Sequence, residues 1–420
     1  MANKITDAEA LAYHAEPTPG KVAIVATKRF EDQRDLSLAY TPGVAVPCLE
    51  IEKNPQDAFK YTSKGNLVAV ISNGTAVLGL GNIGALASKP VMEGKGVLFK
   101  TFSDLDCFDI EVDETNIEKF CDIVCAIAPT FGGINLEDIK APECFEIEKR
   151  IIERLDIPVM HDDQHGTAVI STAGMINACK MTNRKLEDIK VVVVGAGAAA
   201  ISCAKLYKAM GVQNINMIDS KGVCTQNRTD LNKYKQEFSV EGDVTQTEAF
   251  TEADMVIGLS RPGTFSIDDV KLMAKDPIIF TLANPTPEIM PQEVRDARPD
   301  AIIATGRSDF PNQVNNVLGF PFIFRGAMDV QARKINMDMK LAASKALADM
   351  VDSDIPEYLH KAYGVTIEHG REYIIPKPFD KRLIVEISAA VAQAAVDSGS
   401  SSMKDFNIDD YKKELAARQA

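Results

Sequence analysis

Short apolar runs, many of them rich in β-branched residues, recur along the chain between longer amphipathic stretches. In the first 160 residues, Val68–Ile71 and Val97–Thr101 predict strands among helices of uneven length. From about residue 158 to 310 the alternation becomes regular, with strands predicted at Pro158–Met160, Val191–Val194, Ile215–Ile218, Met255–Ile257, Ile278–Leu282 and Ala301–Ala304, and helices such as Thr167–Lys180 and Ala198–Met210 between several of them. This alternation predicts βαβ crossovers and a parallel sheet covered on both faces.

Residues 326–420 are predicted to be mostly helical. Apolar residues from Ala327 to Leu347 include the three- and four-residue spacing of an amphipathic helix, and Val385–Val396 is a second apolar helix candidate. We expect these helices to pack on the body of the protein without chemistry of their own.

Composition and charge narrow the class of protein. The chain is 45% hydrophobic and 25% charged, as in ordinary soluble globular proteins, and its formal net charge of −14 makes nucleic acid an unfavourable partner. The uncharged stretch Gly65–Ser88 is punctuated by glycine and asparagine, which predicts strands and turns and no membrane span. The eight cysteines form no CxxC pair and no secretory signal is evident, so we expect reduced thiols in a cytoplasmic protein.

Two glycine-rich turns compete as a dinucleotide site, which needs a strand, a turn and a helix N-terminus that faces the pyrophosphate. Gly79–Gly84 has the literal GxGxxG spacing, but Pro90 follows where the helix should continue. Gly195–Ala200 is a GxGxxA turn, preceded by four valines and followed by a proline-free helix. The second turn is therefore the predicted dinucleotide site; the alternative is a turn that only lets a helix and a strand pack closely.

An acidic residue ends the strand that follows this turn. Asp219 lies 24 residues after Gly195, where a carboxylate can accept hydrogen bonds from the adenosine ribose hydroxyls. Its charge would repel a ribose phosphate, which favours NAD over NADP. Ser220 and Lys221 follow immediately, and a lysine there could reverse that preference, so both cofactors stay open.

The segment His161–His165 follows the predicted strand Pro158–Met160 and precedes a helix expected to open at Gly166. Its two histidines would need a shared helical face to bind zinc, which a loop at the end of a strand does not provide. Asp162 and Asp163 are better placed to bind a hard cation, because sites of α/β proteins collect ligands at the carboxyl ends of parallel strands. The alternative is that one of them caps the following helix.

Several motifs in one order resemble the malic enzymes, in particular their short bacterial-type form, over about Tyr13 to Arg325. The motifs are Tyr40–Ala45, Gly79–Gly84, Pro90–Lys95 leading to Leu98–Lys100, Asn135–Asp138, His161–Ala168, the turn at Gly195, Leu282–Glu288 and Asn315-Asn316. In this family the Gly79–Gly84 stretch belongs to the substrate domain, which accounts for the competing glycine motif.

The resemblance implies oxidative decarboxylation of malate to pyruvate and carbon dioxide, with NAD or NADP and Mg²⁺ or Mn²⁺. Glu137, Asp138 and Asp163 match the family's metal ligands, and such an oxygen-only set suits these two cations. Taken alone, the acidic pair Glu137-Asp138 would be a solvated turn. Asp162 would orient the metal's ligands or assist proton transfer.

Lys95 and Tyr40 match the family's acid–base residues. Lys95 would take the proton of the C2 hydroxyl, with its pKa lowered by burial beside a cation, and Tyr40 would protonate C3 of enolpyruvate. Taken by themselves, the lysine would be a surface residue and the tyrosine a half-buried core residue.

The same resemblance implies cofactor and substrate contacts. It assigns the cofactor to Gly195, Gly197, Ala198, Ala199, Asp219 and Asn284, and the substrate to Asn284, Asn316 and, with less support, Asn315. The alternative for the asparagines is turn chemistry. The longer eukaryotic forms have a carboxylate-binding arginine where this chain has Ala76, so the residue that binds this carboxylate is not identified.

We therefore expect an α/β protein with a mixed α/β substrate and metal domain at 1–162, a Rossmann-type NAD(P) domain at 163–315, and a helical segment at 316–420 that packs back on the first domain. The resemblance implies a homodimer or higher homo-oligomer, and related short forms raise the option that a partner subunit contributes to the site. No additional acyltransferase-like domain is expected within the 420 residues. The rival functions are a malolactic enzyme, which forms lactate, and a catalytically silent NAD(P)-binding sensor.

Overall fold

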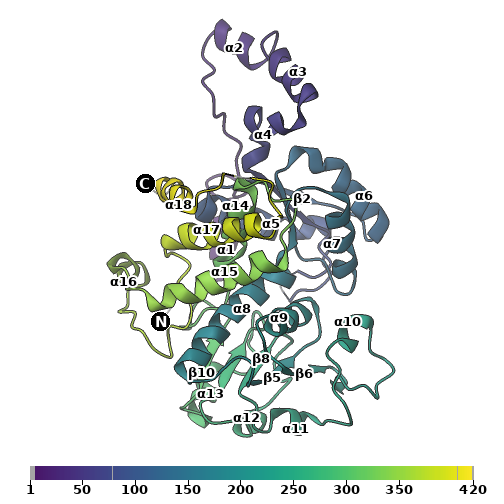
Figure 1. Cartoon of the computed structure of the whole chain (residues 1–420), viewed down its shortest axis with the longest axis vertical. Coiled ribbons are helices and arrows are strands. Elements are labelled where there is room, and N and C mark those ends of the chain that lie inside the picture. Colours follow the sequence, from purple (N-terminus) through teal and green to yellow (C-terminus); the bar gives the residue numbers. More distant parts are fainter. Residues whose placement is uncertain (1–4, 78, 404, 419–420) are drawn as a thin grey trace.

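Two mainly parallel sheets organise the computed structural model, which describes residues 5–77, 79–403 and 405–418 (Figure 1). The first sheet has the order β2-β1-β3-β4 and all its neighbouring strands are parallel. The second has the order β10-β9-β8-β5-β6-β7, and only β7 runs antiparallel to its neighbour. The strands are β1 (Leu67–Ser72), β2 (Asp106–Glu111), β3 (Gly133–Leu136), β4 (Val159–His161), β5 (Lys190–Val194), β6 (Asn214–Asp219), β7 (Gly222–Val223), β8 (Met255–Gly258), β9 (Ile278–Thr281) and β10 (Ile302–Thr305). The predicted α/β class with a Rossmann-type parallel sheet is confirmed.

Helices cover both sheets and form most of the C-terminal part. They are α1 (Asp7–Ala15), α2 (Gln33–Ala39), α3 (Ala45–Lys53), α4 (Ala58–Tyr61), α5 (Ala85–Ser103), α6 (Ile117–Ile127), α7 (Glu143–Arg154), α8 (Asp162–Met181), α9 (Ala198–Ala209), α10 (Lys233–Gln236), α11 (Gln246–Phe250), α12 (Ile267–Lys271), α13 (Pro291–Ala297), α14 (Phe320–Asp329), α15 (Met337–Asp349), α16 (Glu357–Tyr363), α17 (Arg382–Asp397) and α18 (Ile408–Ala417). None of the described helices is both long and apolar enough to cross a membrane.

Helix α8 joins the two sheets. It starts at the end of β4 and packs against α9 of the second sheet and against α15. Its buried apolar residues belong to one core that also takes in α5, β5 and the C-terminal helices α14, α15 and α17. A shared core of this kind holds the site-bearing elements in fixed positions relative to one another.

Three predictions of secondary structure outside the β4–α8 junction are wrong. Val97–Thr101 is not a strand but the last part of α5, whose buried face includes Met92, Gly96 and Phe99 at helical spacing. A short apolar run does not distinguish a strand from a buried helical segment. Pro90 lies inside α5, which continues through it. The single helix expected from Ala327 to Leu347 is in fact two helices, because α14 ends at Asp329 and α15 begins at Met337.

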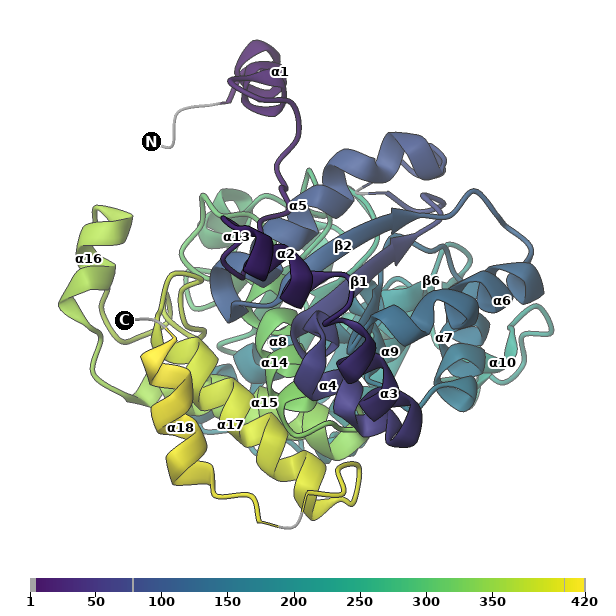
Figure 2. The same cartoon turned by 90° about the horizontal axis from the view of Figure 1, so that it is seen from above.

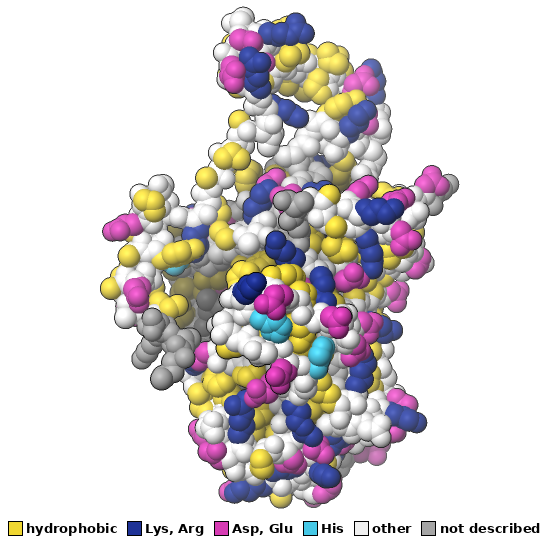
Figure 3. Space-filling view, turned by 90° about the vertical axis from the view of Figure 1, so that its left-hand side faces the viewer, with side chains coloured by type: hydrophobic (Ala, Val, Ile, Leu, Met, Phe, Trp, Pro, Cys, Tyr) yellow, Lys and Arg dark blue, Asp and Glu magenta, His cyan; other side chains and the backbone are white. Residues whose placement is uncertain are grey.

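The N-terminal segment stands away from the body. Helices α2 and α3 form a lobe that projects from the molecule (Figure 1), and α1 is also detached from the sheets (Figure 2). Hydrophobic side chains show on the surface of the lobe in Figure 3. The large apolar residues that are exposed in the N-terminal segment are Ile5, Leu11, Tyr13, Val22, Ile24, Val25, Phe30, Leu36, Leu38, Tyr40, Val44, Val46, Leu49 and Tyr61. So large an exposed apolar surface is typical of an interface with another chain.

Candidate active site

Acidic side chains meet where the neighbouring strands β3 and β4 end. Glu137 and Asp138 follow β3, and Asp163 lies in the first turn of α8, directly after β4. One carboxylate oxygen from each of these three residues lies within 4.8 Å of the others, and Asp163 Oδ2 also accepts the Asp138 backbone N–H at 2.8 Å. The structure therefore brings together the three residues predicted as metal ligands. Such an oxygen donor set suits Mg²⁺ or Mn²⁺.

Lys95 of α5 enters the same acidic cluster. Its Nζ lies 2.8 Å from Glu137 Oε1 and 2.7 Å from Asp162 Oδ2, and its side chain is only 11% exposed. The ammonium also lies over the ring of Phe320, 4.4 Å from the centroid, a contact that the sequence analysis did not foresee. Burial alone would lower the pKa of Lys95, but the charges of Asp162 and Glu137 outweigh it and raise the pKa above its usual value.

The cluster carries more negative charge than one lysine balances. Glu137 is buried and accepts a hydrogen bond from Asn135 Nδ2 at 2.8 Å. Burial raises the pKa of Glu137 well above its usual value; Lys95 opposes this rise, and the nearby aspartates add to it. A divalent cation would relieve this repulsion, so the residues present fit the cation that was predicted from the sequence.

Asn316 is held against the same acidic group. Its Nδ2 donates to Asp162 Oδ2 at 3.1 Å, and its Oδ1 accepts from Thr167 Oγ1 at 2.9 Å. A Cβ on Gly166 would lie 2.1 Å from Asp162 Oδ1, so a glycine is needed for this close approach. The Oδ1 of Asn315, by contrast, accepts the Val317 backbone N–H at 3.0 Å, which is turn chemistry.

The helix after β4 begins four residues earlier than predicted. Asp162 and Asp163 lie in the first turn of α8, and His161 is the N-cap residue, with no side-chain capping bond. The segment is thus not a loop, and neither aspartate is the cap. Carboxylates in a first turn are favoured by the helix dipole, which explains the early start. His165 Nε2 lies 2.9 Å from Glu148 Oε1. In the described part of the chain, neither His161 nor His165 belongs to a group of side chains that could hold a metal ion.

The predicted dinucleotide turn has the geometry of an anion site. Gly195 has a φ of +119°, and a Cβ there would lie 2.6 Å from the Leu259 carbonyl oxygen. Gly197 is the N-cap of α9, so Ala198 and Ala199 place backbone N–H groups in the first turn of a 12-residue helix. These N–H groups have no partner within the helix and can bind a pyrophosphate.

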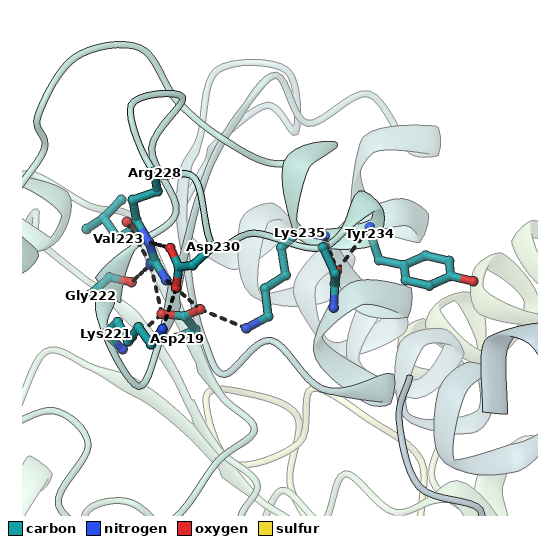
Figure 4. A network of polar contacts seen from close by, with 9 residues as sticks. Asp219, Lys221, Gly222, Val223, Arg228, Asp230, Tyr234 and Lys235 are labelled. Carbon is teal, nitrogen blue, oxygen red and sulfur yellow. Dashed lines mark hydrogen bonds and ion pairs between the residues drawn. The ribbon is translucent and has the colours of Figure 1, made fainter. Parts of the chain in front are cut away.

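Asp219 ends β6 at the centre of a charged network (Figure 4). Arg228 donates Nη1 to Oδ1 at 2.8 Å and Nη2 to Oδ2 at 3.0 Å, and Lys235 Nζ donates to Oδ2 at 2.7 Å. Burial alone would raise the pKa of Asp219, but these hydrogen bonds lower it to about 2. Arg228 also pairs with Asp230, which accepts from Lys221 Nζ at 2.8 Å.

Sequence reasoning considered Lys221 but missed Arg228 and Lys235. They follow Asp219 by 9 and 16 residues through an irregular segment, where no periodicity relates them to the carboxylate. The signal that the sequence offered for Arg228 and Lys235 was the presence of further positively charged residues after the predicted ribose site.

The glycine motif Gly79–Gly84 lies against the domain that contains the second sheet. Gly79 has a φ of +80°, and a Cβ on it would lie 2.7 Å from the backbone oxygen of Asn284. Asn284 follows β9, so this contact brings a loop of the first sheet's domain against a loop of the second sheet. The glycine serves a close approach of two backbones and not a phosphate.

Tyr40 is the one predicted catalytic residue that a single chain does not bring to the site. It caps the C-terminus of α2 on the projecting lobe and is 68% exposed (Figure 1). Lys95 lies in the body, on α5. The structure therefore does not bring Tyr40 together with Lys95 and the acidic cluster within one chain.

Comparisons with known proteins agree with this geometry. Residues 19–152 match the family "malic enzyme, N-terminal domain", and residues 164–362 match "malic enzyme, NAD binding domain". A probable NADP-dependent malic enzyme of Rickettsia prowazekii is 56% identical over 99% of this chain but only 55% of its own length, so the chain spans about half of that relative.

Two further relatives are matched along nearly their whole length. An NADP-dependent malic enzyme of Halomonas elongata is 55% identical over 94% of this chain and 95% of its own. The crystal structure of a malic enzyme from Pyrococcus horikoshii superposes with a TM-score of 0.89 at 42% identity, over 98% of this chain and 95% of that one. With two family domains in order and relatives of the same extent, the chain belongs to the malic enzyme family.

Proposed function

We propose that the protein catalyses the metal-dependent oxidative decarboxylation of malate to pyruvate and carbon dioxide, with reduction of NADP. The observation that carries this proposal is the position of Lys95 Nζ, 2.8 Å from Glu137 and 2.7 Å from Asp162 at the edge of a three-carboxylate cluster. A buried lysine beside a cation site is suited to proton abstraction, and family membership supports malate as the substrate.

Each residue then has a task. Glu137, Asp138 and Asp163 would hold the cation, which would supply Lewis-acid stabilisation of the negative charge that develops on the substrate. The turn at Gly195 would hold the nicotinamide cofactor, which would supply the acceptor for the C2 hydride. Once Glu137 is engaged with a cation, the Lys95 ammonium loses a stabilising partner and can release its proton to water. The neutral amine then takes the proton of the C2 hydroxyl. Asp162, fixed by Asn316, keeps the lysine in place.

The reaction is tested on the purified protein. Reduced-nicotinamide absorbance is followed after addition of L-malate and Mn²⁺, with NAD and NADP in parallel, and pyruvate and lactate are assayed at the end. We expect absorbance to rise with pyruvate and to stop rising after addition of a chelator. Lactate without a rise in absorbance would establish malolactic chemistry, and an absence of turnover with intact cofactor binding would favour the sensor.

The network around Asp219 supports NADP as the preferred cofactor. Both carboxylate oxygens of Asp219 are occupied by Arg228 and Lys235, so few acceptor positions are left for ribose hydroxyls (Figure 4). The same two cations, with Lys221, offer charge-assisted donors to a ribose phosphate. The names of the Rickettsia and Halomonas relatives point the same way.

Arg228→Gln is expected to raise the KM for NADP about 10- to 100-fold, because a charge-assisted hydrogen bond contributes roughly 1.5–3 kcal/mol. The KM for NAD should stay the same or fall, since Asp219 is freed to accept from ribose hydroxyls. Arg295→Gln, an exposed arginine paired with Glu372, is the matched control. Equal losses with both cofactors would contradict the assignment.

We propose that the active form is a homodimer or higher homo-oligomer in which Tyr40 completes the site of a partner subunit. The exposed apolar side chains of residues 5–61 support an interface with a second copy of the chain. Tyr40 would there protonate C3 of enolpyruvate, while Asn284 and Asn316 contact substrate or nicotinamide ribose.

We propose the domain division 1–162, 163–315 and 316–420, supported by two sheets that lie on either side of residue 162. The eight free cysteines support a reducing, cytoplasmic compartment.

A further inference from the structure

His165 and its hydrogen-bond partner Glu148 take no part in the proposed reaction. Glu148 lies on the buried face of α7, together with Cys144, Ile147 and Ile151. A carboxylate among apolar residues is costly unless its charge is compensated. The groups that compensate the charge of Glu148 therefore show which part of the structure this residue holds in place.

Both oxygens of Glu148 bind the junction between β4 and α8. Oε1 accepts the backbone N–H of His161 at 2.9 Å, and the His165 Nε2 atom lies 2.9 Å from Oε1 and 3.0 Å from Oε2. These two partners flank the pair Asp162-Asp163, one on each side in sequence. Burial alone would raise the pKa of Glu148, but His165 and then Lys340 of α15 lower it to about 2.

The position of the acidic pair depends on this junction. Asp162 and Asp163 are the first two residues of α8, where a helix is free to fray unless its first turn is held. Asp162 must reach Lys95, and Asp163 must reach Asp138, each within a hydrogen bond. A contact on both sides of the pair fixes the rotation of the first turn and hence the direction of both carboxylates.

We infer that Glu148 is a positioning residue for the metal site: by holding His161 and His165 it orients Asp162 and Asp163 toward Lys95 and the cation. This role rests on the proposed function, because it assumes that Asp163 is a metal ligand. Groups that orient metal ligands in this way typically change metal affinity by about 10- to 100-fold when they are lost.

The test measures binding and does not need turnover. Mn²⁺ affinity is determined by calorimetry without malate, and NADPH affinity by fluorescence, for the wild-type chain, Glu148→Gln, His165→Leu and His165→Gln. The control is Glu153→Gln, a glutamate on the same helix with its side chain 62% exposed. Glu148→Gln and His165→Leu should weaken Mn²⁺ binding about 10- to 100-fold with NADPH affinity unchanged.

His165→Gln should keep most of the Mn²⁺ affinity, because an amide N–H can still donate to Glu148. Wild-type Mn²⁺ affinity in Glu148→Gln, or a parallel loss of Mn²⁺ and NADPH binding, would overturn the inference. If Glu148→Gln does not fold, the two His165 variants decide: equal Mn²⁺ affinities in them would overturn it. A wild-type chain that binds Mn²⁺ but does not oxidise malate would refute the proposed function and not the role of Glu148.

Discussion

Lys95→Ala is expected to lower kcat for malate oxidation about 10²- to 10⁴-fold, the usual contribution of a positioned acid–base group. The alanine removes the amine that lies between Glu137 and Asp162 and leaves those carboxylates in place. NADPH binding should be unaffected and Mn²⁺ should bind at least as tightly, because a competing positive charge has left the cluster. Stopped-flow or steady-state rates, with binding measured separately, distinguish this result from a loss of folded protein.

Lys89→Ala is the matched control for that experiment. Lys89 lies on the same helix but pairs with Asp109, outside the carboxylate cluster, and its side chain is 42% exposed. We expect near wild-type kcat from it. A Lys95→Ala protein that turns over malate at the wild-type rate while binding both ligands would refute the assigned proton acceptor.

Mixing two inactive variants is expected to restore activity. Tyr40→Phe and Lys95→Ala each disable every site in their own homodimers. If Tyr40 acts on the partner subunit, a dimer with one chain of each kind contains one site with both residues intact. The purified mixed dimer should then show about half of wild-type activity, since one of its two sites is intact.

An active site formed by Tyr40 and Lys95 of the same subunit predicts the opposite result. If Tyr40 reached Lys95 of its own subunit, both sites of a mixed dimer would lack one residue and no activity would return. The subunits are co-expressed with different tags, the mixed dimer is purified through both tags, and its rate is compared with the two parent variants. A doubly tagged wild-type dimer serves as the reference.

Sequence periodicity predicted the second sheet well. Strands β5, β6, β8, β9 and β10 all appear within a residue or two of their predicted limits, because buried parallel strands are continuous apolar runs. It did not separate Val97–Thr101 from a helix, since a run of five residues fits either structure. The split between α14 and α15 was also missed, because the apolar spacing continues across the break.

The site was predictable only in part for a related reason. Asp163 could be placed at the end of a predicted strand, but Asp138 was grouped with it only through the family resemblance, because no strand was predicted before Glu137. Arg228 and Glu148 could not be placed at the site, because their contacts depend on how an irregular segment and a helix face pack against the site. Tyr40 lies on the projecting lobe, away from the body of the chain. Hydrophobic periodicity predicts which residues form helices, but it does not predict that these helices stand apart from the body.

The 20-residue helix α8 also limits how the chain can change in length. It carries the acidic pair at its start and packs farther along on α9, where Ser171 Oγ lies 3.5 Å from Cys203 Sγ. Deleting one residue between these points would turn the carboxylates by about 100° relative to the second sheet, since an α-helix has about 3.6 residues per turn. Surface loops can gain and lose residues during evolution, but the spacing from Asp163 to Ser171 cannot drift by even one position without separating the two halves of the site.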